Sequence, residues 1–178
     1  MRYIALIRGI NVSEKNKVSM PELRSALGGL GFEDVATLLN SGNVAFSTDD
    51  GDDRVLSRLI SEKIRGHFGV DVPVYVAQQK ALEQILLNEP DWWGSNDKAT
   101  YDNLIFAIPP LTVGEVCAAL GEPNVDLERI KCFRNVIFRT FDLSNYRKTN
   151  RWAKTASSDI RDGITIRTAN TVRRLVLL

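Results

Sequence analysis

A short turn with the sequence Asn40-Ser41-Gly42-Asn43 separates two apolar runs, at residues 35–39 and 44–46. Asn and Gly tolerate the positive φ angles that tight turns require, so this pattern predicts a β-hairpin. Amphipathic helices are predicted on both sides of it, at residues 19–31 and 49–69, from capping residues and apolar side chains at helical spacing. A hairpin between two helices, each with an apolar face to bury, requires a sheet that both helices can cover.

Further strands are predicted at residues 3–7 and 72–76, which gives residues 1–77 the order β-α-β-β-α-β of a ferredoxin-like unit. The second half repeats that order without similarity in sequence. Its elements are a strand at 104–108, a helix at 112–121, a hairpin around Arg134-Asn135, a basic helix near 145–156 and a strand at 164–167. We therefore predict an α+β fold of two ferredoxin-like (βαββαβ) subdomains in tandem, with antiparallel sheets, helices packed on one face, and a C-terminal helix at 172–177. The expected division is 1–77, a linker helix and loop at 78–100, and 101–178.

In a ferredoxin-like sheet the end of the first strand and the hairpin turn lie at the same edge. This places several polar residues together, namely Arg8, Asn11, Asn40, Ser41 and Asn43, with Lys15 and Lys17 on the loop that follows. So many donors and so few carboxylates suit a phosphate, a carboxylate or a nucleotide better than a metal, and no metal site is predicted. The leading prediction is therefore a protein that binds a small anionic ligand, a nucleotide or a phosphorylated metabolite, at this site. The alternative is structural: Asn-Ser-Gly-Asn is ordinary turn chemistry, and Arg8 could pair with a helix carboxylate.

Arg167 and Asn170 form a second polar cluster, at the junction between the last strand and the terminal helix. An arginine beside free helix N–H groups can hold an anion, although helix capping alone would explain Thr168 and Asn170. From residue 147 to the C-terminus there are eight Arg or Lys against two Asp. A nucleic-acid-binding module is therefore the alternative function, and its candidate contacts are Arg147, Arg151, Lys154, Arg167, Arg173 and Arg174. A basic helix face that is merely solvated is the other explanation.

No familiar catalytic motif is present, so catalytic residues and the reaction, if any, are not identified, and no cofactor is predicted. The sequence lacks a run apolar enough for a membrane span and a signal peptide, which favours a cytoplasmic protein without a membrane partner. Cys117 and Cys132 lie in segments of core-like pattern, and we expect two buried, reduced thiols. An exposed Trp92-Trp93 loop that meets a protein partner is a third possibility. The oligomeric state is left open.

Residues 8–20, 40–46 and 165–171 resemble the signature segments of a mainly bacterial family, domain of unknown function 1697. The most specific matches are Arg8-Gly9-Ile10-Asn11-Val12 and Ser41-Gly42-Asn43-Val44. The resemblance covers essentially the whole chain and implies two ferredoxin-like subdomains with no established activity. Two departures stand out: Ser13-Glu14 replaces glycines, and Thr168 and Ala169 replace an Asn and a Trp in the final motif.

Overall fold

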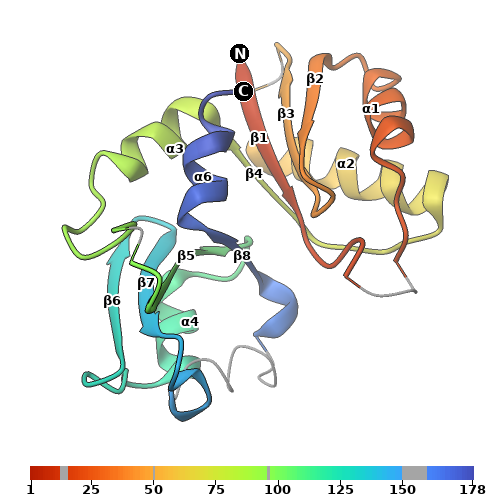
Figure 1. Cartoon of the computed structure of the whole chain (residues 1–178). Helices are drawn as coiled ribbons and strands as arrows, with labels where there is room; N and C mark the ends of the chain where they lie inside the picture. The colour runs from red at the N-terminus through yellow and green to blue at the C-terminus, as the bar shows by residue number, and fades with distance from the viewer. Residues whose placement is uncertain (13–15, 50, 96, 150–159) are drawn as a thin grey trace. The chain divides into compact units, whose positions relative to one another are not determined.

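The computed structural model describes residues 1–12, 16–49, 51–95, 97–149 and 160–178 (Figure 1). The chain divides into two compact units, one of residues 1–83 with 175–178 and one of residues 84–174. Each unit contains one four-stranded sheet. In the part of the chain that is described, no helix is long and apolar enough to cross a membrane.

The first unit follows the predicted β-α-β-β-α-β order. Its elements are β1 (Arg2–Ile7), α1 (Met20–Gly28), β2 (Glu33–Leu38), β3 (Asn43–Ser47), α2 (Asp53–Phe68) and β4 (Val74–Gln78), followed by α3 (Gln79–Leu86). The strands are ordered β2-β3-β1-β4 and every neighbouring pair is antiparallel. β1 and β2 are therefore parallel to each other with β3 between them, which confirms the predicted ferredoxin-like topology.

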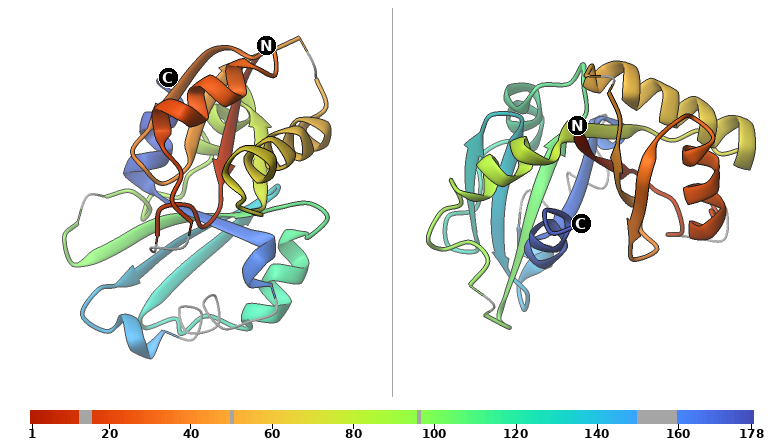
Figure 2. Two further views of the ribbon diagram at one scale, coloured as in Figure 1. Left: turned by 90° about the vertical axis from the view of Figure 1, so that its right-hand side faces the viewer. Right: turned by 90° about the horizontal axis from the view of Figure 1, so that it is seen from above.

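The core of the first unit lies between the sheet and the two helices α1 and α2, which share one face of the sheet (Figure 2). Alternate residues of β1 contribute to it, as the period of a strand requires. The rings of Phe32 and Phe46 stack at 4.3 Å between centroids, and Phe46 and Tyr3 at 5.7 Å. The helix side chains that complete this core are Leu23, Leu27, Leu56, Ile60 and Ile64. Burial of each such side chain stabilises the fold by about 1.5–3 kcal/mol.

The turn between β2 and β3 packs tightly against the end of β1. Ile7 donates its backbone N–H to the Gly42 carbonyl oxygen at 2.7 Å. Gly42 has a φ of 74°, and a Cβ built on it would lie 2.8 Å from both Cβ and the carbonyl oxygen of Ile7. Only glycine fits this position without strain, because the backbone is left-handed and the neighbouring strand leaves no room.

The second unit has the same strand arrangement, ordered β6-β7-β5-β8 with antiparallel neighbours. Its described elements are β5 (Thr100–Ala107), α4 (Val113–Leu120), β6 (Glu128–Phe133), β7 (Val136–Asp142), the 3-10 turns η1 (Tyr146–Lys148) and η2 (Arg161–Gly163), β8 (Ile164–Thr168) and α6 (Ala169–Leu175). The two halves thus form the predicted tandem of ferredoxin-like subdomains. The basic helix predicted near 145–156 falls mostly on residues 150–159, outside the described ranges.

The predicted C-terminal helix is present as α6, and it begins earlier than the apolar period indicated. Thr168 Oγ1 accepts the backbone N–H of Thr171 at 3.2 Å, so Thr168 provides the cap. Beyond α6 the last residues belong to the first unit. Gln79 Nε2 donates to the Val176 carbonyl oxygen at 2.7 Å, and an Arg2 guanidinium nitrogen donates to that of Leu178 at 2.9 Å.

α4 covers one face of the second sheet, where Val116 and Leu120 pack on Ile105, Ile137 and Ile164. The same unit buries an ion pair between Arg139 of β7 and Glu128 of β6. The two charged groups approach to 3.1 Å and both side chains are 0% exposed. Glu128 also accepts the backbone N–H of Asn124 at 3.2 Å, and the Arg139 guanidinium lies 4.7 Å from the Phe141 ring centroid. Such a pair is tolerated inside because each partner offsets the desolvation of the other.

Two sequence expectations are wrong in the second unit. Trp93 is only 2% exposed, donates its indole N–H to the Asn103 carbonyl oxygen and meets Phe138 edge-on, so it is a core residue and not part of an exposed docking loop. The cysteines are not buried either: Cys117 is half-buried and Cys132 is exposed, because Cys132 lies near the end of the edge strand β6.

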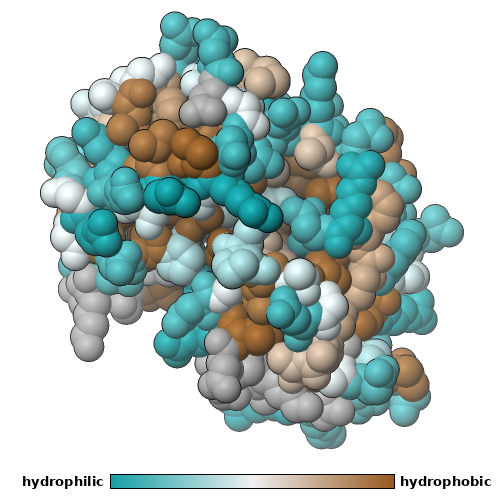
Figure 3. Space-filling model, turned by 180° about the vertical axis from the view of Figure 1, so that it is seen from behind, coloured by the Kyte–Doolittle hydropathy of each residue, from teal (hydrophilic) through white to brown (hydrophobic). Residues whose placement is uncertain are grey.

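Hydrophobic side chains reach the surface in several separate patches on the face that Figure 3 presents, with hydrophilic side chains between them. Scattered apolar exposure of this kind is normal for a globular domain. The exposed Val55 and Leu59 of α2 are examples of apolar residues at the surface of the first unit.

We expect Gly42→Ala to lower the free energy of unfolding by about 1–3 kcal/mol, since the new methyl group meets Ile7 and the left-handed backbone disfavours alanine. Gly66→Ala is the matched control. Gly66 lies inside α2 with nothing within 4 Å of a built Cβ, so alanine there should raise stability by about 0.5–1 kcal/mol. Urea unfolding of both variants measures the difference. Equal effects would contradict the close contact at Gly42.

Candidate functional site

The loop that follows β1 is held by hydrogen bonds from its own amides. Gly9 and Asn11 both have left-handed backbones, with φ values of 70° and 56°. Asn11 donates its backbone N–H to the Asn16 carbonyl oxygen at 2.9 Å, and Asn16 Nδ2 donates to the Gly9 carbonyl oxygen at 3.1 Å. These bonds join the two described sides of the loop.

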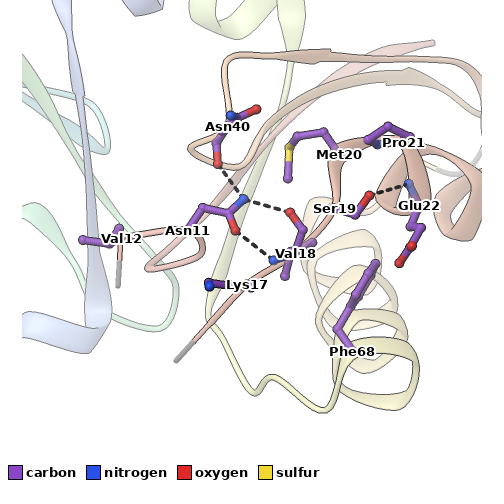
Figure 4. Close-up of a pocket in the computed structure, with 10 residues that line it drawn as sticks. All are labelled: Asn11, Val12, Lys17, Val18, Ser19, Met20, Pro21, Glu22, Asn40 and Phe68. Atoms are coloured by element: carbon purple, nitrogen blue, oxygen red, sulfur yellow. Dashed lines mark hydrogen bonds between the residues drawn. The ribbon is translucent and has the colours of Figure 1, made fainter. Parts of the chain in front are cut away.

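Asn11 also connects this loop to the β2–β3 turn (Figure 4). Its Nδ2 donates to the carbonyl oxygens of Val18, at 2.8 Å, and Asn40, at 2.9 Å, while its Oδ1 accepts the Val18 N–H at 2.8 Å. Both amide protons and one acceptor position are therefore used within the protein. Asn11 fixes the wall of the site and is not available as a donor to a ligand.

Ser41 and Asn43 stabilise the β2–β3 turn through side-chain hydrogen bonds. Asn43 is 0% exposed, and its Nδ2 donates to the Leu38 carbonyl oxygen at 3.0 Å and to Ser41 Oγ at 2.9 Å. A buried amide needs such partners, because an unpaired one would cost its full desolvation. These two residues shape the turn and do not line the cavity beside it.

A cavity of about 980 Å³ opens between the loop, the turn and the first turn of α1. Ten residues line it: Asn11, Val12, Lys17, Val18, Ser19, Met20, Pro21, Glu22, Asn40 and Phe68. The cavity is wide open to solvent, so it has the form of a surface groove. In Figure 4 Asn11 lies between Asn40 and Val18, and Phe68 enters from the C-terminal end of α2.

The first turn of α1 contributes charges of both signs to the cavity. Ser19 is the N-cap, and its side chain accepts the backbone N–H of Glu22 at 3.5 Å. The N-terminal end of a helix carries a partial positive charge. Lys17 adds an ammonium group and Glu22 a carboxylate, so the formal charges of the lining sum to zero and the cavity has both a positive and a negative group.

Among the residues described, the lining offers one ammonium, one carboxylate, the Asn40 amide and a hydroxyl beside an apolar wall, since the Asn11 amide is already bonded within the protein. This is chemistry for binding a polar ligand. It does not pair a nucleophile with a base, and the described ranges contain no group of three or more His, Cys, Asp or Glu that could hold a metal ion.

The structure thus brings together three of the predicted site residues, Asn11, Lys17 and Asn40. Arg8 is half-buried and donates its backbone N–H to the Pro73 carbonyl oxygen, but it does not line the cavity. Lys15 lies outside the described residues. The expected convergence of Arg8, Ser41 and Asn43 in the same pocket is therefore not found.

The second predicted cluster lies in the other unit and has its own internal bonds. One Arg167 guanidinium nitrogen donates to Thr165 Oγ1 and to the Ile166 carbonyl oxygen, both at 2.8 Å. Asn170 is exposed in the first turn of α6, and Thr168 performs the capping. The structural alternative foreseen for Thr168 accounts for what is observed.

Sequence reasoning missed the apolar lining, above all Met20, Pro21 and Phe68. Phe68 falls on the apolar period of α2, which indicates a core residue, and it is half-buried against the core while it also lines the cavity. The available signal was its position in the last turn of α2, next to Gly69.

Asn11→Asp keeps the shape of the side chain and its tolerance of a positive φ, but it removes the Nδ2 group that donates to the carbonyl oxygens of Val18 and Asn40. We expect the free energy of unfolding to fall by about 1–3 kcal/mol, since two hydrogen bonds become contacts between oxygens. Asn40→Asp is the control, because the Asn40 side chain is exposed and makes no hydrogen bond with the described residues; it should change stability by less than about 0.5 kcal/mol. Chemical denaturation compares the two, and similar losses would argue against the Asn11 clamp.

Comparison with known proteins supports the same topology. The chain matches the family described as "Protein of unknown function (DUF1697)" over residues 1–138. It is also similar to a solved structure described as that of conserved bacterial protein SP0830 from Streptococcus pneumoniae, with 32% sequence identity and a TM-score of 0.86 over 99% of this chain and 97% of that one. The comparison with curated proteins gives no match. The chain therefore belongs to the DUF1697 family.

Proposed function

We propose that this protein binds a small anionic ligand, a nucleotide or a phosphorylated metabolite, in the cavity beside the first turn of α1. The observation that carries the proposal is the gathering of Asn11, Lys17 and Asn40 around that cavity. These residues come from the two polar segments of the sequence, and Asn11 joins those segments by hydrogen bonds. These hydrogen bonds fix the position of Asn11 in the cavity wall.

The charges of the lining favour one anionic group on the ligand over several. Lys17 and the N-terminal end of α1 attract a phosphate or carboxylate. Glu22 sits in the same turn and would repel additional charge, but its carboxylate can accept hydrogen bonds from sugar hydroxyls. A monophosphate that also carries hydroxyl groups can interact with Lys17 through its phosphate and with Glu22 through its hydroxyls.

The apolar side of the cavity can cover a planar or aliphatic part of the same ligand. Met20, Pro21 and Phe68 provide this surface. Most small-molecule sites combine such a wall with a few polar groups that fix orientation. A nucleoside monophosphate, with one charged group, hydroxyls and a flat base, uses all three parts of the lining.

The nucleic-acid alternative receives less support. Arg173 is already engaged: one of its guanidinium nitrogens lies 2.7 Å from Glu89 Oε1, another donates to the Gly94 carbonyl oxygen, and the group lies 5.6 Å from the Trp93 ring centroid. Arg167 makes the internal bonds described above. Arg151 and Lys154 lie outside the described ranges, while Arg147 and Arg174 are exposed. Among the described members of this set, no contact favours a nucleic acid over the cavity ligand.

A thermal-shift screen with nucleoside monophosphates, sugar phosphates and inorganic phosphate tests the proposal. A ligand at a hundredfold excess over its Kd stabilises the native state by about 2.7 kcal/mol, which raises the unfolding midpoint by several degrees. We expect at least one monophosphate with hydroxyl groups to give a saturable shift and inorganic phosphate to give a smaller one. A screen without any saturable shift would contradict the proposal.

Lys17→Gln then locates the site. Removing the charge should weaken binding of the compound found in the screen by about 1.5–3 kcal/mol, or roughly 10- to 150-fold in Kd. Lys80→Gln is the matched control, an exposed lysine of α3 in the same unit that does not line the cavity. Isothermal titration calorimetry on both variants gives the comparison. Equal affinities would place the ligand elsewhere.

A further inference from the structure

Two cysteine side chains from different elements of the second unit lie against each other. Cys117 Sγ of α4 and Cys132 Sγ of β6 are 3.1 Å apart, with fourteen residues between them in sequence. Neither cysteine is in a disulfide bond, which would require about 2.05 Å between the sulfurs. We propose that this pair is a redox-modification site, at which a hydroperoxide converts the two thiols into a reversible intramolecular disulfide. The proposal is independent of the ligand cavity, which lies in the other unit.

The fold directs the two thiols toward each other. Cys117 lies on the stripe of α4 that also carries Val116 and Leu120, and it packs at the border of the core. Cys132 is two residues from Ile130, so both point to the face of the sheet that α4 covers. In the sheet Cys132 pairs with Ile137, another residue of the same core. The pair therefore sits where the border of α4 meets the edge strand.

Backbone hydrogen bonds stabilise the segment between the two cysteines near both of its ends. Gly121 donates its backbone N–H to the Cys117 carbonyl oxygen at 3.0 Å, and Glu128 donates its own to that of Asn124 at 2.8 Å. The buried Glu128 carboxylate in turn accepts from Asn124 and pairs with Arg139. Thiols held in contact in this way react with each other at high effective concentration.

The two cysteines differ in exposure to solvent, so the more exposed one reacts first with the hydroperoxide. Cys132 is exposed and Cys117 is half-buried. The Cys132 thiolate attacks one oxygen of the hydroperoxide and the O–O bond breaks. This step leaves a sulfenic acid on Cys132 and releases water or an alcohol. The Cys117 thiolate then attacks the Cys132 sulfur, the S–O bond breaks, and the hydroxide takes up a proton and leaves as water.

The two reaction steps are balanced in electrons and protons. Together the two thiols lose two protons and two electrons, which reduce hydrogen peroxide to two molecules of water. A small dithiol reverses the reaction by thiol–disulfide exchange. The product joins α4 covalently to β6, and a cross-link that closes a loop of this size restricts the unfolded chain.

The test uses the full-length wild-type protein with hydrogen peroxide in modest excess. We expect both titratable thiols to be lost, the intact mass to fall by about two hydrogens, and peptide mapping to show Cys117 linked to Cys132. The thermal midpoint should rise by roughly 5–10 °C, and dithiothreitol should reverse every change. Persistence of the thiols, a gain of oxygen mass or a covalent dimer would each overturn the proposal.

The double variant Cys117→Ser/Ala118→Cys is the matched control. Ala118 is exposed and adjacent on α4, so the thiol stays on the same helix but moves about 100° around it, away from Cys132. We expect intramolecular disulfide formation to slow by at least about tenfold. Formation at the wild-type rate would show that proximity in the native fold does not govern the reaction.

Discussion

The first unit depends on the contact between Gly42 and the end of β1. The backbone hydrogen bond from Ile7 and the absence of a side chain at Gly42 let the β2–β3 turn come directly against the neighbouring strand. This close approach brings Asn40 within reach of the Asn11 side chain. The loop, the turn and the start of α1 then border one open cavity, so a steric requirement at a single glycine helps to place its polar groups.

Much of the fold could be predicted from the sequence, because the residues that define it act locally. Ser19 and Thr112 cap helices, the glycines end them, and Asn40 to Asn43 mark the hairpin. Strand ends were less predictable. β6 begins at Glu128 and β7 continues to Asp142, beyond the apolar runs, because Arg139 and Glu128 neutralise each other inside the sheet. A reading of apolar periodicity cannot detect two charges that are buried together.

The candidate site was predictable in place but not in detail. Topology alone puts the β1 loop beside the hairpin, and Asn11, Lys17 and Asn40 do line one cavity. Whether a side-chain amide is available to a ligand or donates to a backbone carbonyl depends on the local packing around it. Asn11 and Asn43 both bond to the protein itself, a distinction that residue type does not reveal. The two cysteines show a similar limit of sequence-based prediction. The apolar pattern predicts that they face the core, but it does not predict whether other residues cover them at the border of that core.

The last four residues have a consequence for biosynthesis. Residues 175–178 belong to the first unit, and Arg2 and Gln79 hold them there through backbone carbonyl oxygens. Domains of a growing chain generally fold in the order in which they emerge. Here the first unit lacks residues 175–178 until all of residues 84–174 have been synthesised. The unit that begins first is therefore completed last.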